Sequence, residues 1–173
     1  MTFFDIEGYE PRWLTGRQAI VSAHGARLAA LAGRRLTGAW LAWDLDDGTW
    51  FADAPVLLGF EGEQVELCHH KFDELSITWR TADPLRRARW TFGDDPAIRL
   101  AWRTGARAEL AELQGRRLRS VELLEWAGDD LARGMVAPRF AFADGGAVTV
   151  HNALDENGLE FGEPDPAYRR YRL

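Results

Sequence analysis

The sequence is poor in the residues that form covalent cross-links and cysteine-based metal sites. Its 173 residues include one cysteine, Cys68, so an intrachain disulfide and a zinc site built from several cysteines are both excluded. Lysine is equally scarce, because Lys71 is the only lysine among 21 basic residues. Serine occurs only at Ser22, Ser76 and Ser120.

The sequence contains no long apolar run, and we expect no secretory signal. The N-terminus has neither the basic nor the apolar region of a secretory signal, and no run of apolar residues is long enough to span a bilayer. We therefore expect a cytoplasmic protein without membrane association. The formal net charge of −6 offers no general attraction for phosphate groups, so nucleic-acid binding is not expected.

Short catalytic motifs are absent too. The chain has no GxSxG, HExxH, P-loop or GxGxxG sequence, and none of its serines lies in a glycine-flanked turn. Cys68 precedes His69, but neighbouring residues on a strand point to opposite faces, so a buried and unreactive thiol is expected. Without these motifs the sequence does not decide whether the protein is an enzyme, but it favours a protein that is not. We predict no cofactor.

What the chain does contain is an internal similarity. Residues 25–36 read GARLAALAGRRL and residues 105–118 read GARAELAELQGRRL, and an Asp-Glu pair follows each segment, at Asp73-Glu74 and at Asp155-Glu156. The GRRL segments and the Asp-Glu pairs are both separated by 82 residues. Segments that recur in the same order at nearly constant spacing predict one structural unit present twice.

Each predicted repeat contains one short helix and about four strands. The GAR segments are rich in helix-forming residues and end in Gly33 and Gly115, where a C-terminal glycine cap is expected. Apolar or alternating runs then predict strands from residues 36–43 and 118–126 onward. Residues 19–21 are assigned to a strand by analogy with 98–102, although Thr15 and Gln18 also form a capping-box pattern that could begin a helix.

These elements predict an α+β fold of mostly antiparallel β structure, in which two tandem pseudo-twofold repeats share one core. A closed, barrel-like sheet is the alternative. We expect a single domain over residues 1–173. Its predicted parts are the first repeat at 17–81, a connector at 82–96, the second repeat at 97–162, and an extended tail at 163–173.

The densest group of potential ligands surrounds the two Asp-Glu pairs. Imidazole and carboxylate groups are common metal ligands, and pseudo-symmetry could bring the two sets together. Their spacing matches no known metal motif, and polar residues at hairpin ends are the alternative interpretation. The candidate metal ligands are His69, His70, Asp73, Glu74, His151, Asp155 and Glu156.

The tryptophan residues and the arginine pairs could each have a functional or a structural role. The eight tryptophans could line a ligand pocket, but aromatic residues at strand spacing are more often core. The arginine pairs at 34–35, 116–117 and 169–170 could bind an anionic partner. Their recurrence in the repeat favours a structural cause, such as charge at a helix C-terminus or pairing with acids.

The run from Gly134 to Phe161 contains the sequence NALDENG at residues 152–158. This run resembles the C-terminal half of small bacterial proteins of unassigned function that share that signature. The resemblance implies a compact bacterial domain. It brings no activity, cofactor or catalytic residue with it.

The sequence supports two hypotheses about function. The leading hypothesis is a non-enzymatic binding module for a protein partner, of the immunity kind, whose acidic surface would attract a basic target. The alternative is a small-molecule or metal-binding protein, or an enzyme, with a site between the two repeats. The sequence does not predict the oligomeric state.

Overall fold

The computed structural model describes residues 4–173. In chain order the elements are β1 (Phe4–Asp5), β2 (Trp13–Thr15), α1 (Arg17–Ala29), β3 (Leu36–Asp44), β4 (Val56–Phe60), β5 (Glu63–His70), β6 (Glu74–Trp79), β7 (Ala88–Trp90), β8 (Ile98–Arg103), α2 (Ala108–Leu113), β9 (Leu118–Trp126), β10 (Val136–Phe142), β11 (Ala147–Asn152), β12 (Asn157–Phe161) and β13 (Tyr168–Arg172). None of the described helices is long and apolar enough to cross a membrane.

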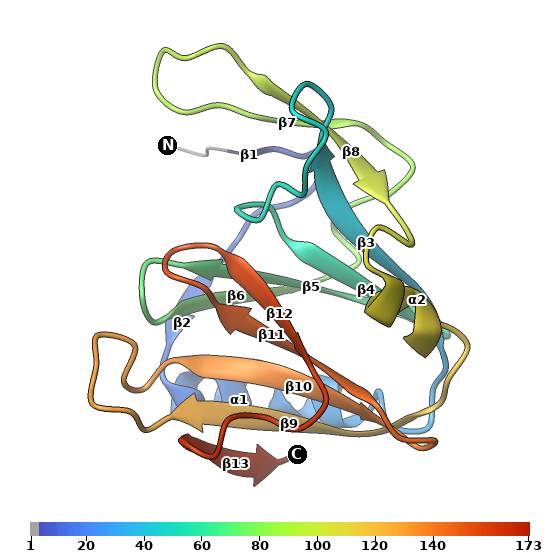
Figure 1. Cartoon of the computed structure of the whole chain (residues 1–173), viewed down its shortest axis with the longest axis vertical. Helices are drawn as coiled ribbons and strands as arrows, with labels where there is room; N and C mark the ends of the chain where they lie inside the picture. Colours follow the sequence, from blue (N-terminus) through green and yellow to red (C-terminus); the bar gives the residue numbers. More distant parts are fainter. Residues whose placement is uncertain (1–3) are drawn as a thin grey trace.

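The strands form two antiparallel sheets, so mostly antiparallel β structure is confirmed (Figure 1). The larger sheet has the order β1-β7-β8-β3-β4-β5-β6-β2 and is strongly curled, and the smaller has the order β12-β11-β10-β9-β13. Strand β3 joins β8 to β4 within the curled sheet. Its residues 36–40 pair with β4, and its residues 41–44 pair with β8. The described strands of this sheet end at β1 and β2 without closing, so the predicted barrel alternative is wrong.

The main core lies between the two sheets. Apolar side chains from both sheets form one buried cluster, which includes Leu58 and Leu67 from the larger sheet and Val121 and Val150 from the smaller. A second cluster covers the opposite face of the larger sheet and includes Leu57 and Cys68. Strand β4 is buried at every position because both of its faces are covered.

The predicted strand at residues 19–21 is wrong, because these residues lie in α1. The helix begins after Gly16, which has φ +84°, and no side chain caps its first turn. Ile20 and Leu28 are fully buried on one face of α1, so tertiary packing favours the helix over the short apolar run. In α2, Leu110 and Leu113 are buried as the helical spacing predicts.

The two GRRL segments contact each other directly. Gly33 N–H donates to the Leu118 carbonyl at 2.8 Å, and Gly115 N–H donates to the Leu36 carbonyl, also at 2.8 Å. The guanidinium of Arg35 donates to the Gly115 carbonyl at 2.9 Å, and that of Arg117 donates to the Gly33 carbonyl. These arginines therefore satisfy backbone carbonyls of the opposite segment, which is a structural role.

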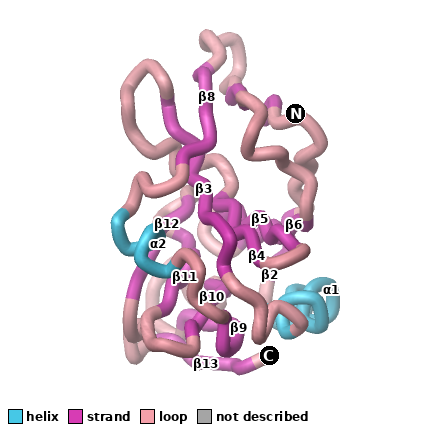
Figure 2. Tube along the Cα trace, turned by 90° about the vertical axis from the view of Figure 1, so that its right-hand side faces the viewer, coloured by secondary structure: helices cyan, strands magenta, loops and turns pink. Residues whose placement is uncertain are grey.

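The connector and the tail each contain a strand. Strand β7 lies in the connector and pairs with β1 and β8. Strand β13 lies in the tail and pairs with the edge of β9. Strand β1 lies beside β7 at one end of the molecule, and β13 with the C-terminus lies at the opposite end (Figures 1 and 2).

Candidate functional site

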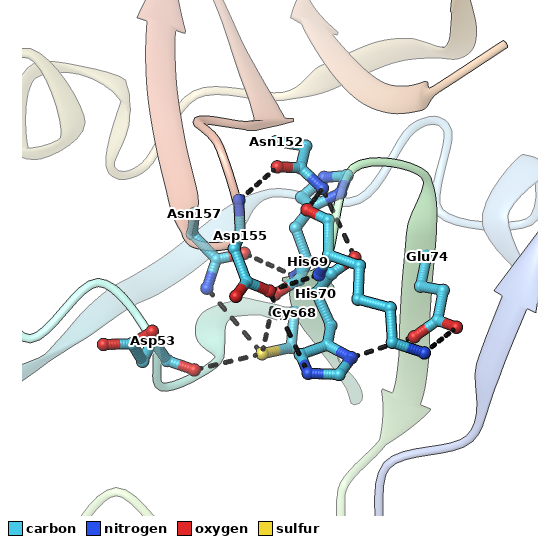
Figure 3. Close-up of polar contacts among 9 residues, drawn as sticks. Asp53, Cys68, His69, His70, Glu74, Asn152, Asp155 and Asn157 are labelled. Carbon is cyan, nitrogen blue, oxygen red and sulfur yellow. Dashed lines mark hydrogen bonds and ion pairs between the residues drawn. The ribbon is translucent and has the colours of Figure 1, made fainter. Parts of the chain in front are cut away.

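The two Asp-Glu turns lie against each other (Figure 3). The Lys71 N–H donates to the Asp155 carboxylate, and Asn152 Nδ2 donates to the Lys71 carbonyl at 2.8 Å. Asn152 also accepts from the Asp155 N–H at 3.0 Å, and His70 Nε2 lies 3.9 Å from Asp155 Oδ1. We call the meeting of residues 70–74 with residues 152–157 the turn junction.

Asn157 fixes the turn junction from inside the protein. Its side chain accepts from the His69 N–H at 2.8 Å and donates to the carbonyls of Ala52 and Ala54, both at 2.9 Å. Asn157 is 1% exposed, and its hydrogen bonds with the His69 N–H and the Ala54 carbonyl are buried. The sequence analysis missed this residue, since its partners come from two distant segments.

Gly158 follows Asn157 for a steric reason. The opposite residue on β11 is His151, and a Cβ atom on residue 158 would lie 2.3 Å from His151 Nε2. A side chain at this position would displace the imidazole. Asn152, Asp155 and Asn157 of the NALDENG run therefore have structural roles in the turn junction, and Gly158 has one beside it.

Backbone strain is concentrated at the turn junction. Lys71, Leu154 and Asp155 have φ values of 51°, 64° and 74°, and only Arg80 shares this left-handed region among the described non-glycine residues. Such residues cost of order 1 kcal/mol or more each and persist where surrounding contacts impose them, often at functional sites. The concentration of strained residues therefore makes the turn junction a candidate functional site.

The first turn carries a group of charged side chains. His70 Nδ1 lies 2.9 Å from Glu74 Oε2, and Lys71 Nζ donates to Glu74 Oε1 at 2.8 Å. Burial alone would raise the pKa of Glu74, but the hydrogen bonds from Lys71 and His70 outweigh it and lower that pKa. The ring of His70 packs on Trp13 with centroids 4.8 Å apart.

The other predicted ligands do not join this group. His69 is buried, its Nε2 lies 3.0 Å from the Val150 carbonyl, and burial lowers its pKa to about 4. His151 lies against Asn152 and Glu160, Asp73 is half-buried, and Glu156 is exposed. Within residues 4–173 no three His, Cys, Asp or Glu side chains are placed to hold a metal ion. The metal site remains a prediction that elemental analysis can test.

A pocket of about 630 Å³ opens beside the turn junction. Four aromatic side chains line it, namely Phe4, Trp13, Trp90 and Phe92. The N-terminal segment supplies Phe4 and Trp13, while Trp90 and Phe92 come from β7 and the residues that follow it. Ligand pockets of small molecules are commonly apolar and aromatic in this way.

The polar part of the pocket is acidic. Glu10, Asp53 and Asp155 line it together with His69 and His70. Burial raises the pKa of Asp53, and the nearby carboxylates of Glu156 and Asp155 raise it further. Asp155 is thus contributed by the second half of the chain, whereas the other residues that line the pocket lie between Phe4 and Phe92.

Cys68 lies behind the pocket and is fully buried. Its thiol donates to the Asp53 carbonyl at 3.3 Å, and burial raises its pKa to about 12. The thiol is therefore neutral at pH 7. The expected buried thiol is what the structure contains, and it does not form a reactive Cys-His pair.

The tryptophans lie at the margins of the core. All eight are partly buried and none belongs to the fully buried set, so the interpretation of these residues as core is only partly correct. Trp13 and Trp90 line the pocket, as the less favoured interpretation predicted for some of them.

Comparison with known proteins adds no further information, since no family model, curated protein or solved structure matches the chain. The resemblance to NALDENG proteins therefore stays a prediction, and the site is interpreted from its geometry alone.

Proposed function

We propose that this chain is a small-molecule-binding protein whose ligand occupies the pocket beside the turn junction. The observation that carries the proposal is the composition of that pocket, in which aromatic rings and carboxylates converge around a volume of about 630 Å³. A volume of this size falls within the usual range for small-molecule sites, about 300–1,000 Å³. The proposal corresponds to the sequence alternative of a site between the two halves.

The scaffold around the pocket supports this function. In the turn junction, Asp155 of the second half accepts a hydrogen bond from the Lys71 N–H of the first half and lies 3.9 Å from His70 Nε2, and Asn152 donates to the Lys71 carbonyl. Asn157 holds the segment near Asp53 through the carbonyls of Ala52 and Ala54. Polar groups that are fixed before a ligand arrives lose less entropy on binding, which increases affinity.

We also infer that the chain arose as a duplicated unit with approximate twofold symmetry. The strand orders β8-β3-β4-β5-β6 and β13-β9-β10-β11-β12 correspond element by element. Each helix contacts the first long strand of the other half, α1 with β9 and α2 with β3. The reciprocal hydrogen bonds of the GRRL segments support the same inference, with the axis between Arg35 and Arg117.

A fragment screen tests the proposed function. Ligand-detected NMR with neutral, cationic and anionic fragments should identify binders that Trp13→Ala weakens. The matched control is Trp102→Ala, another partly buried tryptophan that does not line the pocket. Absence of any binder, or equal loss in both variants, would count against the proposal.

A protein partner, the leading hypothesis from the sequence, has one observation in its favour. Phe72 and Leu154 are 44% and 73% exposed, one on each turn of the turn junction. Neighbouring exposed apolar side chains are typical of interaction surfaces. A double variant with serine at both positions should lose a specific partner that a Leu131→Ser control, 78% exposed elsewhere, retains.

A further inference from the structure

Two of the aromatic residues that line the pocket are held by contacts with neighbouring rings. Trp90 packs against Phe51 and Phe92, with ring centroids 5.2 Å and 5.8 Å away. Trp13 is held against His70 at 4.8 Å. The faces of indole and phenyl rings carry partial negative charge, so they attract cations as well as apolar groups.

The carboxylates are the permanently charged groups among the described residues that line the pocket. Glu10, Asp53 and Asp155 line it, and no lysine or arginine is among the described residues that do so. Lys71 stands next to the pocket, but its ammonium is hydrogen-bonded to Glu74 at 2.8 Å. Among the residues from 4 onward that line the pocket, none therefore balances the three carboxylates with a permanent positive charge.

We propose that the ligand of this pocket is a small organic cation, in which an ammonium, quaternary ammonium or amidinium group is attached to a compact apolar body. This inference rests on the proposed function and specifies its ligand class. The aromatic rings contact the apolar body and the cationic centre, and the carboxylates supply the opposite charge.

Other ligand classes fit this lining less well. An anion would bring a further negative charge toward the three carboxylates that line the pocket, which is electrostatically unfavourable. A bare metal ion needs several ligands at close range, and residues 4–173 hold no such group. A neutral apolar molecule would bury carboxylates without compensating their charge.

Matched probes of different charge test the inference directly. Benzamidine, benzamide and benzoate have nearly the same size and carry positive, zero and negative charge, and choline and 3,3-dimethylbutan-1-ol form a second isosteric pair. Each is titrated into the wild-type protein at pH 7.5 while ¹H–¹⁵N spectra are recorded. We expect each cation to bind at least about tenfold more tightly than its neutral counterpart, and benzoate not to bind.

A conservative variant locates the charge that is recognised. Asp53→Asn should weaken benzamidine binding about five- to tenfold while benzamide binding stays the same, since only the charge is removed. Asp144→Asn is the matched control, because Asp144 is an exposed residue in a turn away from the pocket lining. Added salt should weaken the binding of benzamidine and leave that of benzamide unchanged.

The possible results separate the two proposals. If benzamide or benzoate binds in the pocket as tightly as benzamidine, small-molecule binding stands and the cation inference is wrong. If no probe shifts the resonances of pocket residues, while a fragment of another class does, the cation inference alone fails. If neither these probes nor any fragment binds there, both proposals fail.

Discussion

Asn157 is a neutral side chain placed where several backbone groups of the first half need a hydrogen-bond partner. The His69 N–H and the carbonyls of Ala52 and Ala54 all point at its amide. Only an amide offers both an acceptor and two donors at this size. Asn157 therefore links the turn junction to the segment that carries Asp53.

Asn157→Ala should lower the free energy of unfolding by about 3 kcal/mol, because it leaves the buried His69 N–H and Ala54 carbonyl without partners. Urea denaturation measures the loss. The control Glu156→Ala removes an exposed neighbour and should change stability by less than about 0.5 kcal/mol. Equal effects of the two variants would refute this role for Asn157.

His69 should make the protein sensitive to mild acid. Its pKa is about 4 in the folded state and near 6.5 when the chain is unfolded, so the unfolded state binds a proton first as the pH falls. Stability from this residue is therefore complete above pH 6.5 and is lost progressively down to pH 4. At pH 5 the loss should be about 2 kcal/mol relative to pH 7.5.

Urea denaturation at pH 7.5 and pH 5 tests the effect of His69. In His69→Gln the additional loss at pH 5 should disappear, because glutamine does not titrate and can still donate to the Val150 carbonyl. In the control His151→Gln, which changes a partly exposed histidine, the loss should persist. The same acid dependence in wild type and His69→Gln would assign the effect to other groups.

At the scale of elements, several strands could be predicted because the local pattern decides them. Residues 36–43 are apolar at nearly every position and residues 118–126 alternate loosely, and the structure has strands in both places. The strand predicted at residues 19–21 is wrong, because the burial of Ile20 in a helix depends on packing against distant segments. Strand β13 consists of tyrosine and arginine residues and has no apolar pattern that predicts a strand. It is extended because its backbone pairs with the edge of β9.

In the candidate site, too, residues marked by the local sequence could be predicted, and residues placed by distant contacts could not. The Asp-Glu pairs could be singled out because they recur, and their turns do meet. Trp13, Asp53 and Asn157 could not be found in this way, since each reaches the site through contacts with segments far away in the chain. Periodicity reports which face of an element is buried, but not which distant element covers it.

The inferred symmetry predicts equal costs for equivalent substitutions in the two GRRL segments. Gly33 and Gly115 have φ values of 89° and 83°, and an added Cβ would meet nothing within 4 Å at either. Alanine at each position should therefore cost about 1–2 kcal/mol, entirely from the left-handed backbone. Denaturation of both single variants measures this, and costs that differ by more than about 1 kcal/mol would contradict the symmetry.

At the scale of the whole molecule, the two sheets depend on one core. The main buried cluster draws side chains from both, with Phe60 and Phe140 stacked at 6.0 Å between them. Neither sheet could keep its inner face covered without the other. The protein should therefore unfold as one unit, which in turn keeps the pocket residues of both halves together.

Coincident unfolding curves would demonstrate that single unit. Far-ultraviolet circular dichroism and tryptophan fluorescence should give the same urea midpoint, because both sheets lose their core in one transition. Two separated transitions, or different midpoints for the two probes, would mean that the halves unfold independently.

The central claim is that the pocket beside the turn junction binds a small molecule. The most direct measurement is the ¹H–¹⁵N spectrum of the protein, with assigned indole N–H resonances, during titration with benzamidine. We expect saturable shifts of Trp13 and Trp90, which line the pocket, and no shifts of Trp43 or Trp126, which do not. Saturable shifts confined to Trp43 or Trp126 would place binding elsewhere and contradict the account.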